Sequence, residues 1–269
     1  YLVPKQLAEN GLADLHTEFA DVAINQVIED YTRESGVRGL DREIGTICRK
    51  IARSILVNKD SNQIHSVDDK MVTKLLGARK YRREAAEGHD MIGVVTSLVW
   101  TPFGGEIMFV EALKMRGSNK LILTGSLGDV LQESAQTALS YIRSNAVKYG
   151  IAEDFFDYTD IHIHLPAGGI AKDGPSAGAA IAVAIISLLT ERPARRDVAI
   201  TGEMTLSGQL LPVGGIREKV IAAARGGVTR ILLPARNEEE ITALSDDVES
   251  NMQLLLVDSL PQMIENILL

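Results

Sequence analysis

The first 78 residues carry apolar side chains at helical spacing. Residues 20–31 form one such segment. Residues 40–57 form a longer one, with an apolar stripe of Leu40, Ile44, Ile47, Ile51 and Ile55. A third helix begins at the capping sequence of residues 66–69 and ends near Gly77. This pattern predicts a small all-helical domain over residues 1–78, with no strand.

The helical pattern stops at residues 79–90, which are mostly charged and have almost no large apolar side chain. Such a run is typical of a solvated linker, and we prefer this interpretation to a binding patch. From residue 91 onward, short apolar runs of strand length alternate with longer helical patterns.

Strands are expected at residues 92–100, 106–115, 120–124, 161–165, 198–202, 205–211, 231–233 and 254–257. Helices are expected at residues 127–148, 176–190 and 216–225, with further helices after the last two strands. Strands mixed with helices in this way indicate an α/β (α+β) domain over residues 91–269.

Composition and charge narrow the class of protein. The 269 residues are 45% hydrophobic, which is enough for two domains with buried cores. The formal net charge of −8 argues against a nucleic-acid-binding surface. No apolar run reaches the length that a membrane-crossing helix needs. The chain begins at Tyr1 without an initiator Met, so we interpret it as a fragment of a longer protein.

Cys48 is the only cysteine, which leaves no partner for an internal disulfide and suits a reducing compartment. Its neighbours Ile47 and Ile51 lie on the apolar stripe of the second predicted helix. We therefore expect a buried thiol rather than a reactive one.

Residues 174–178, Gly-Pro-Ser-Ala-Gly, match the pattern G-x-S-x-G found around some nucleophilic serines. Small neighbours leave Ser176 exposed, and a helix that begins there directs backbone N–H groups at developing negative charge. The same residues are equally ordinary in a turn that starts a helix. The motif by itself leaves both interpretations open.

A nucleophilic serine needs a base, and the order of residues limits the choice. The α/β-hydrolases place a histidine after the serine, whereas all five histidines of this chain precede Ser176. Lys219 is the one lysine that follows Ser176, and a lysine can replace histidine in such enzymes. On a helical wheel Lys219 lies at the border of the apolar face, where a lysine with a buried stem and a solvated amine is the ordinary alternative.

Two long segments resemble the proteolytic domain of Lon proteases: PAGGIAKDGPSAG at residues 166–178 and TGEMTLSGQLLPVGGIREK at residues 201–219. The resemblance implies a serine peptidase that forms an acyl-enzyme, with Ser176 as nucleophile and Lys219 as general base. Residues 1–78 look like the helical lid of the family's AAA+ ATPase module. The segment YTRESGVRGL at residues 31–40 resembles the part of that lid that bears a nucleotide-sensing arginine, which would be Arg38.

The resemblance also implies supporting residues. The Thr201 hydroxyl would hydrogen-bond the Lys219 amine and orient it. His162 and His164 share one face of a short strand and would lie beside the active site as structural or orienting groups; no further cluster completes a zinc site. Asp173 either gates the loop before Ser176 or favours a turn. Gly168, Gly169 and Gly174 give that loop the freedom to form or break an oxyanion hole.

The strand pattern alone, without the resemblance, makes Glu111 a candidate site residue. It shares a period-two strand face with Ile107, Phe109 and Leu113, and a carboxylate on an apolar face is costly unless it is paired. An edge strand whose face is partly wet explains Glu111 about as well.

The sequence has no G-x-x-x-x-G-K-[ST] motif and so no P-loop. By resemblance, ATP and Mg²⁺ serve the full-length parent, whereas peptide hydrolysis needs no cofactor and no metal. The resemblance further implies a homohexamer, unfolded or damaged protein as substrate, and the cytoplasm or the mitochondrial matrix as the location. The alternative function is a non-catalytic lid and ring-assembly module. An ester hydrolase is disfavoured because no histidine follows the serine.

Overall fold

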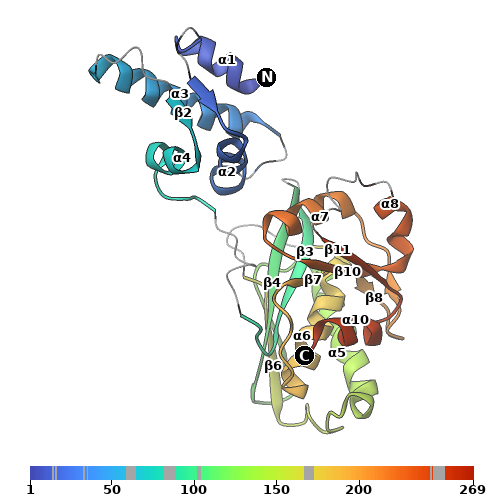
Figure 1. Cartoon of the computed structure of the whole chain (residues 1–269). Coiled ribbons are helices and arrows are strands. Elements are labelled where there is room, and N and C mark those ends of the chain that lie inside the picture. Colours follow the sequence, from blue (N-terminus) through green and yellow to red (C-terminus); the bar gives the residue numbers. More distant parts are fainter. Residues whose placement is uncertain are drawn as a thin grey trace. The chain divides into compact units, whose positions relative to one another are not determined.

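The computed structural model describes residues 1–13, 15, 17–32, 34, 36–58, 65–81, 89–101, 104–166, 173–242, 244 and 252–269. The chain forms two compact units, Tyr1–Arg82 and Arg83–Leu269 (Figure 1).

The first unit is built mainly from helices. Its elements are α1 (Leu2–Glu9), β1 (Thr17–Phe19), α2 (Asp21–Tyr31), α3 (Arg38–Asn58), β2 (His65–Val67) and α4 (Asp69–Leu76). The helices predicted from the apolar pattern are confirmed as α2, α3 and α4, and the predicted stripe of α3 enters the core of this unit. Cys48 is buried in that core, where burial raises the pKa of its thiol to about 11.

The expectation of an all-helical domain is wrong in one respect. β1 and β2 pair in parallel, with Thr17 opposite His65 and Phe19 opposite Val67. Each strand has three residues, which is too short for alternation to show in the sequence. Helix α1 was not predicted either.

The predicted linker begins as part of the first unit. The Arg79 guanidinium lies 3.2 Å from the Asp30 carboxylate, and Lys80 Nζ lies 2.6 Å from the Glu43 carboxylate. The backbone N–H groups of Lys80 and Tyr81 both donate to the carbonyl of Asp30. Residues 79–81 therefore pack onto the first unit, and residues 82–88 of the expected linker lie outside the described residues.

A seven-stranded sheet forms the centre of the second unit, in the order β11-β10-β7-β3-β4-β6-β5. Its strands are β3 (Val94–Thr101), β4 (Gly104–Arg116), β5 (Leu121–Thr124), β6 (Thr159–His164), β7 (Val198–Ile200), β10 (Arg230–Pro234) and β11 (Gln253–Val257). β4 runs antiparallel to both β3 and β6, and the other neighbours pair in parallel. This mixed sheet confirms the predicted α/β class.

Helices cover both faces of the sheet (Figure 1). α5 (Asp129–Asn145), α6 (Gly178–Thr190) and α10 (Leu260–Ile267) share a core with one face, and α7 (Ile216–Arg225) and α8 (Glu238–Thr242) share a core with the other. β4 shows the division, because Met108 and Val110 point into the first core whereas Ile107 and Phe109 point into the second. Short 3₁₀ turns are η1 (Ala146–Tyr149), η2 (Pro175–Ala177) and η3 (Ala235–Asn237).

The single strand expected at residues 205–211 is wrong. Two short strands, β8 (Glu203–Met204) and β9 (Leu210–Leu211), form an antiparallel hairpin instead. Its turn is closed by backbone hydrogen bonds between Thr205 and Gln209 and between Gly208 and Thr205. Gly208 adopts a φ of 79°, a left-handed conformation that favours glycine.

α6 is buried from Gly178 to Leu188, which confirms the buried helix that the apolar run predicts. Of the helices that the structure describes, none is long and apolar enough to cross a membrane.

Candidate active site

Ser176 lies in the 3₁₀ turn η2, immediately before the buried helix α6. Gly174, two residues before Ser176, has a φ of 141°, a backbone conformation that favours glycine. The carbonyl of Ser176 accepts a 2.9 Å hydrogen bond from the N–H of Gly202, and the carbonyl of Gly202 accepts one from Ala179. These bonds fix the serine turn to the residues that follow β7.

Lys219 projects from α7 and is 2% exposed. Its Nζ donates a 3.0 Å hydrogen bond to Thr201 Oγ1, which is the bond expected between these two residues. Thr201 directly follows β7 and is itself 1% exposed. Its hydroxyl also lies 3.5 Å from the carbonyl of Ser176, so one threonine links the lysine amine to the serine turn. No hydrogen bond joins Ser176 directly to Lys219, both of which belong to the described chain.

Burial controls the protonation of Lys219. Removal of the amine from water lowers its pKa from 10.5 to about 8, and the negative charge of Glu240 opposes that shift. With a pKa of about 8, roughly one Lys219 amine in ten is neutral at pH 7, compared with under about one in a thousand for a solvated lysine. The environment thus favours the form of lysine that can accept a proton.

Gly105 allows α7 to approach the sheet closely enough to bury Lys219. A Cβ atom at Gly105 would lie 2.0 Å from the carbonyl oxygen of Glu218 and 2.7 Å from the backbone N of Lys219. Trp100, the cross-strand partner of Gly105, similarly lies against Gly215 at the start of the helix. The first turn of α7 therefore packs against Gly105 of β4 and the Trp100 ring of β3.

The expectation that the helix after Ser176 directs free N–H groups at developing negative charge is wrong for two of those groups. The N–H of Gly178 donates to the carbonyl of Pro175, and the N–H of Ala179 donates to the carbonyl of Gly202. An oxyanion hole made from either group would require one of these bonds to break. The predicted contributors Gly168 and Gly169 lie outside the described residues.

Asp173 caps a different helix. Its side chain is exposed and its Oδ1 accepts a 3.3 Å hydrogen bond from the N–H of Leu131, in the first turn of α5. A Cβ atom at Gly128 would lie 2.4 Å from the Asp173 carboxyl carbon, so glycine leaves room for this cap. Asp173 forms no ion pair with Lys219, and both residues are described.

Glu111 is exposed, which favours the alternative of a partly wet strand face over that of a paired carboxylate on an apolar face. Ile107 and Phe109 of the same face are partly buried under α7, but Leu113 beyond them is 58% exposed. The face leaves the core at Glu111, so no buried partner is required. In register, Glu111 lies opposite His164 of β6.

His162 and His164 lie on one face of β6, as predicted, and their rings share a hydroxyl. Thr124 Oγ1 lies 2.9 Å from His162 Nε2 and 2.7 Å from His164 Nδ1. Neither ring hydrogen-bonds Ser176 or Lys219. The described residues contain no group of three or more His, Cys, Asp or Glu side chains that could hold a metal ion.

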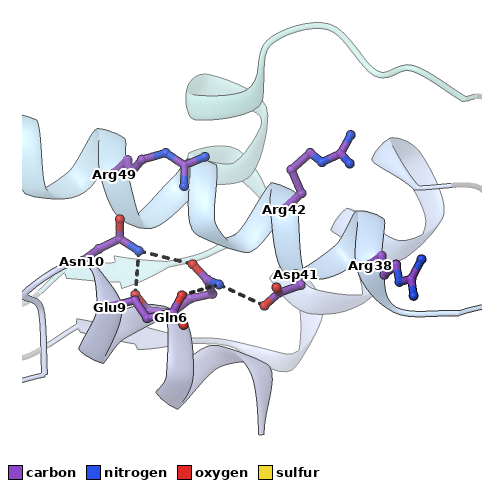
Figure 2. Close-up of a pocket in the computed structure, with 7 residues that line it drawn as sticks. All are labelled: Gln6, Glu9, Asn10, Arg38, Asp41, Arg42 and Arg49. Carbon is purple, nitrogen blue, oxygen red and sulfur yellow. Dashed lines mark hydrogen bonds between the residues drawn. The ribbon is translucent and has the colours of Figure 1, made fainter.

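Arg38 is the first residue of α3 and lines a pocket of about 480 Å³ in the first unit (Figure 2). The lining comprises Gln6, Glu9, Asn10, Arg38, Asp41, Arg42 and Arg49. Asp41 is engaged by Lys5 and Gln6, and the hydrogen bond from Lys5 lowers the pKa of the Asp41 carboxyl. The three arginines have no described carboxylate within ion-pair distance, so their guanidinium groups fit a phosphate.

Several residues that shape these sites were not identified from the sequence. The Glu34 carboxylate accepts hydrogen bonds of 2.7 and 2.9 Å from the N–H groups of Gly39 and Leu40, and so caps α3 beside Arg38. Glu240, whose charge acts on Lys219, is one of three consecutive glutamates and carries no distinguishing signal. Gly105 likewise occurs in an ordinary Gly-Gly pair.

Comparison with known proteins identifies a family for both units. Residues 66–269 match the Lon protease (S16) C-terminal proteolytic domain, and residues 8–64 match the Lon protease AAA+ ATPase lid domain. Lon protease of Citrifermentans bemidjiense is 49% identical over 260 residues, which cover 97% of this chain and 32% of that protein.

Two further relatives give the same result. Lon protease of Aquifex aeolicus is 49% identical over 97% of this chain and 33% of its own length. Lon protease 1 of Myxococcus xanthus is 48% identical over 96% and 31%. The chain thus spans about a third of the length of the relatives it matches. It belongs to the Lon protease family, of which it comprises the lid and the C-terminal proteolytic domain.

Proposed function

We propose that the second unit is a serine endopeptidase in which Ser176 is the nucleophile and Lys219 is the general base. The observation that carries this proposal is the buried Lys219 amine, tied through Thr201 to the turn that bears Ser176. Burial lowers the pKa of Lys219 to about 8, which suits a base that works near neutral pH.

In the proposed reaction, neutral Lys219 accepts the hydroxyl proton of Ser176 while Oγ attacks the peptide carbonyl carbon. The Lys219 ammonium then gives that proton to the leaving amine, and the peptide C–N bond breaks to leave an acyl-enzyme. Lys219 next takes a proton from the water that attacks the acyl carbon, the ester bond to Ser176 Oγ breaks, and Lys219 returns the proton to that oxygen. Each proton transfer requires Ser176 Oγ, or the water that replaces it, within hydrogen-bond reach of Lys219 Nζ.

The remaining candidates have supporting roles in this proposal. Thr201 orients the Lys219 amine, because its hydroxyl is the acceptor of the Nζ hydrogen bond. Asp173 fixes the residues before Ser176 through its bond to α5. Glu111, His162 and His164 act as structural or orienting groups, supported by their shared position across β4 and β6.

The longer protein to which such a chain would belong is proposed to couple this peptidase to ATP. Arg38 would contact the nucleotide phosphates, supported by its place among guanidinium groups that have no described carboxylate within ion-pair distance. ATP and Mg²⁺ would be held chiefly by a P-loop segment that this sequence does not contain. We further propose assembly into a homohexamer, unfolded or damaged proteins as substrates, and a cytoplasmic location, which the free, buried Cys48 suits.

A non-catalytic lid and assembly module is the alternative. The depressed pKa of Lys219 disfavours it, since burying an amine without need is costly.

The experiment is hydrolysis of an unstructured fluorogenic peptide by the parent chain, Ser176→Ala and Lys219→Arg. Both variants are expected to retain less than a few per cent of the parent rate, because alanine has no nucleophile and arginine does not deprotonate. Ser140→Ala and Lys148→Arg, at exposed positions of α5 and η1, are the matched controls and should cleave normally. Near-normal cleavage by either dyad variant would refute the assignment, and a parent with no Ser176-dependent cleavage would favour the assembly module.

A further inference from the structure

Asn237 is a buried amide that holds the backbone leading into α7. It ends the 3₁₀ turn η3, between β10 and α8, and is 1% exposed. Its Nδ2 donates a 2.9 Å hydrogen bond to the carbonyl of Val213, and its Oδ1 accepts a 3.1 Å bond from the N–H of the same residue. Val213 lies two residues before Gly215, the N-cap of α7, and Lys219 lies four residues after Gly215.

The same amide also holds Glu240. Asn237 Nδ2 donates a second hydrogen bond, of 2.8 Å, to Glu240 Oε1 on α8. Glu240 is exposed, but α8 packs against α7, and the Glu240 charge raises the pKa of Lys219 against the effect of burial. One side chain thus contacts both the start of the lysine helix and the carboxylate that acts on the lysine.

Other charged residues lie on the elements packed against α7, namely Glu106, Glu111, Lys114 and Arg116 of β4, Glu238 and Glu239 of α8, and Arg217, Glu218 and Arg225 of α7 itself. Arg196 also reaches this side of the sheet, 3.6 Å above the centre of the Phe109 ring. β3 carries no titratable residue. Among the charged groups that the structure describes, Glu240 is the one whose charge shifts the pKa of Lys219.

We propose that Asn237 is a positioning residue for the reaction: it fixes the backbone that leads into α7 and holds the Glu240 carboxylate where its charge acts on the Lys219 amine. This role rests on the proposed function of Ser176 and Lys219. The hydrogen bonds between Asn237 and Val213 fix the position of Lys219. The hydrogen bond from Asn237 to Glu240 controls how readily the Lys219 amine binds a proton.

A general base needs a balance between these effects. Burial alone makes the amine neutral but weakly basic, whereas a carboxylate restores basicity at the expense of the neutral fraction. An exposed glutamate can keep this balance only if it is held in place, because a free side chain samples many rotamers and is screened by water. The buried amide of Asn237 supplies that restraint.

The test compares Glu240→Gln with Glu239→Gln in the pH dependence of kcat/KM for the fluorogenic peptide. Glutamine at position 240 keeps an oxygen that accepts from Asn237 and removes only the charge. The acidic limb of the profile should move down by a few tenths to about one pH unit in Glu240→Gln. Glu239→Gln makes the same change in net charge on the same helix and should leave the limb in place. Coincident profiles for the parent and both variants would overturn the role of Glu240.

Asn237→Ala tests the positioning itself. It should move the acidic limb in the same direction as Glu240→Gln, and it should speed backbone hydrogen exchange at residues 213–219. In the double variant the limb should move no further than in either single variant, because both changes remove one interaction. Additive shifts would overturn the proposal. If Asn237→Ala does not fold, coincident profiles in the Glu240 and Glu239 pair would still overturn it, because the proposal requires the Glu240 charge to act on Lys219. Loss of cleavage in Ser176→Ala, run in parallel, keeps a failure here distinct from a failure of the proposed function.

Discussion

At the scale of single residues, Lys219 is deeply buried, and few interactions compensate its charged amine for the loss of water. Its described hydrogen-bond partner is the neutral hydroxyl of Thr201, and no described carboxylate lies within ion-pair distance. A charged amine in such a place loses most of its hydration and gains little in return. The same imbalance that would make Lys219 a poor structural residue makes it a usable base.

Burial of Lys219 predicts a specific dependence of stability on pH. The pKa is about 8 in the folded chain and 10.5 when solvated, so between these values the unfolded chain binds more protons. The free energy of unfolding should therefore rise as pH increases from 8 to 10.5. Below pH 8 the folded chain bears the full energetic cost of burying the charged amine. Over a shift of about 2.5 units the cost is on the order of 3 kcal/mol.

Lys219→Met should remove that cost. We expect it to raise the free energy of unfolding at pH 7 by up to about 3 kcal/mol and to leave it nearly unchanged at pH 10.5 or above. Denaturant unfolding at several pH values measures both numbers. Lys148→Met, at an exposed position, is the control and should show no such trend. Equal effects of Lys219→Met at pH 7 and pH 10.5 would mean that the amine is not buried as described.

At the scale of elements, α7 depends on how closely it can approach the sheet. Its backbone passes so near Gly105 that no side chain fits there without displacing the helix. Ile216, Val220 and Ala223 fill the core beneath it, which places Lys219, next to Val220, under cover. The position of the Lys219 amine is therefore set by a strand residue far away in sequence.

Gly105→Ala should separate α7 from β4. The new methyl group would meet backbone atoms of Glu218 and Lys219 that cannot rotate away. We expect a loss of about 1–3 kcal/mol in stability, typical of overpacking, and a larger relative loss of peptidase activity because Lys219 moves. Gly214→Ala, where a Cβ atom meets nothing within 4 Å, is the matched control. Thermal unfolding and peptide hydrolysis would distinguish the two, and equal behaviour would contradict this account.

The sequence predicts α7 well and its surroundings poorly, for physical reasons. The predicted bounds of α7 agree with the structure because an apolar stripe and a terminal Gly-Gly pair are local signals. The helical wheel places Lys219 only at the border of the apolar face, and the depth of its burial depends on Gly105, which comes from another element. The pattern predicts one strand where β8 and β9 form a hairpin, because the turn residues, Thr205 to Gln209, include a single glycine.

The site shows the same contrast between local and distant signals. Ser176 and Lys219 were identified through motifs and a family resemblance, and the bond from Lys219 to Thr201 was foreseen. The sequence leaves two environments open for Glu111, because alternation shows which face a residue shares but not where that face leaves the core. Asn237 and Glu240 gave no signal, because their roles arise from contacts between α7 and α8.

At the scale of the whole molecule, the family match and the compact units divide the chain at different points. The match to the proteolytic domain begins at residue 66, whereas the second compact unit begins at Arg83. The segment between them contains α4, which packs against α2 and α3 of the first unit. Val72 of α4 is fully buried in the core of that unit. Residues 66–81 therefore belong physically to the lid.

This division predicts that residues 83–269 form an independent peptidase. A fragment of that range keeps the whole central sheet, both of its helical layers and the proposed dyad, so it should unfold cooperatively and retain Ser176-dependent cleavage of the fluorogenic peptide. A fragment of residues 66–269 should behave no better, since α4 would lack the partners that bury Val72. Calorimetry and peptide hydrolysis on both fragments and on the parent chain provide the comparison. Cooperative unfolding that appears only when residues 66–82 are present would show that α4 supports the proteolytic unit instead.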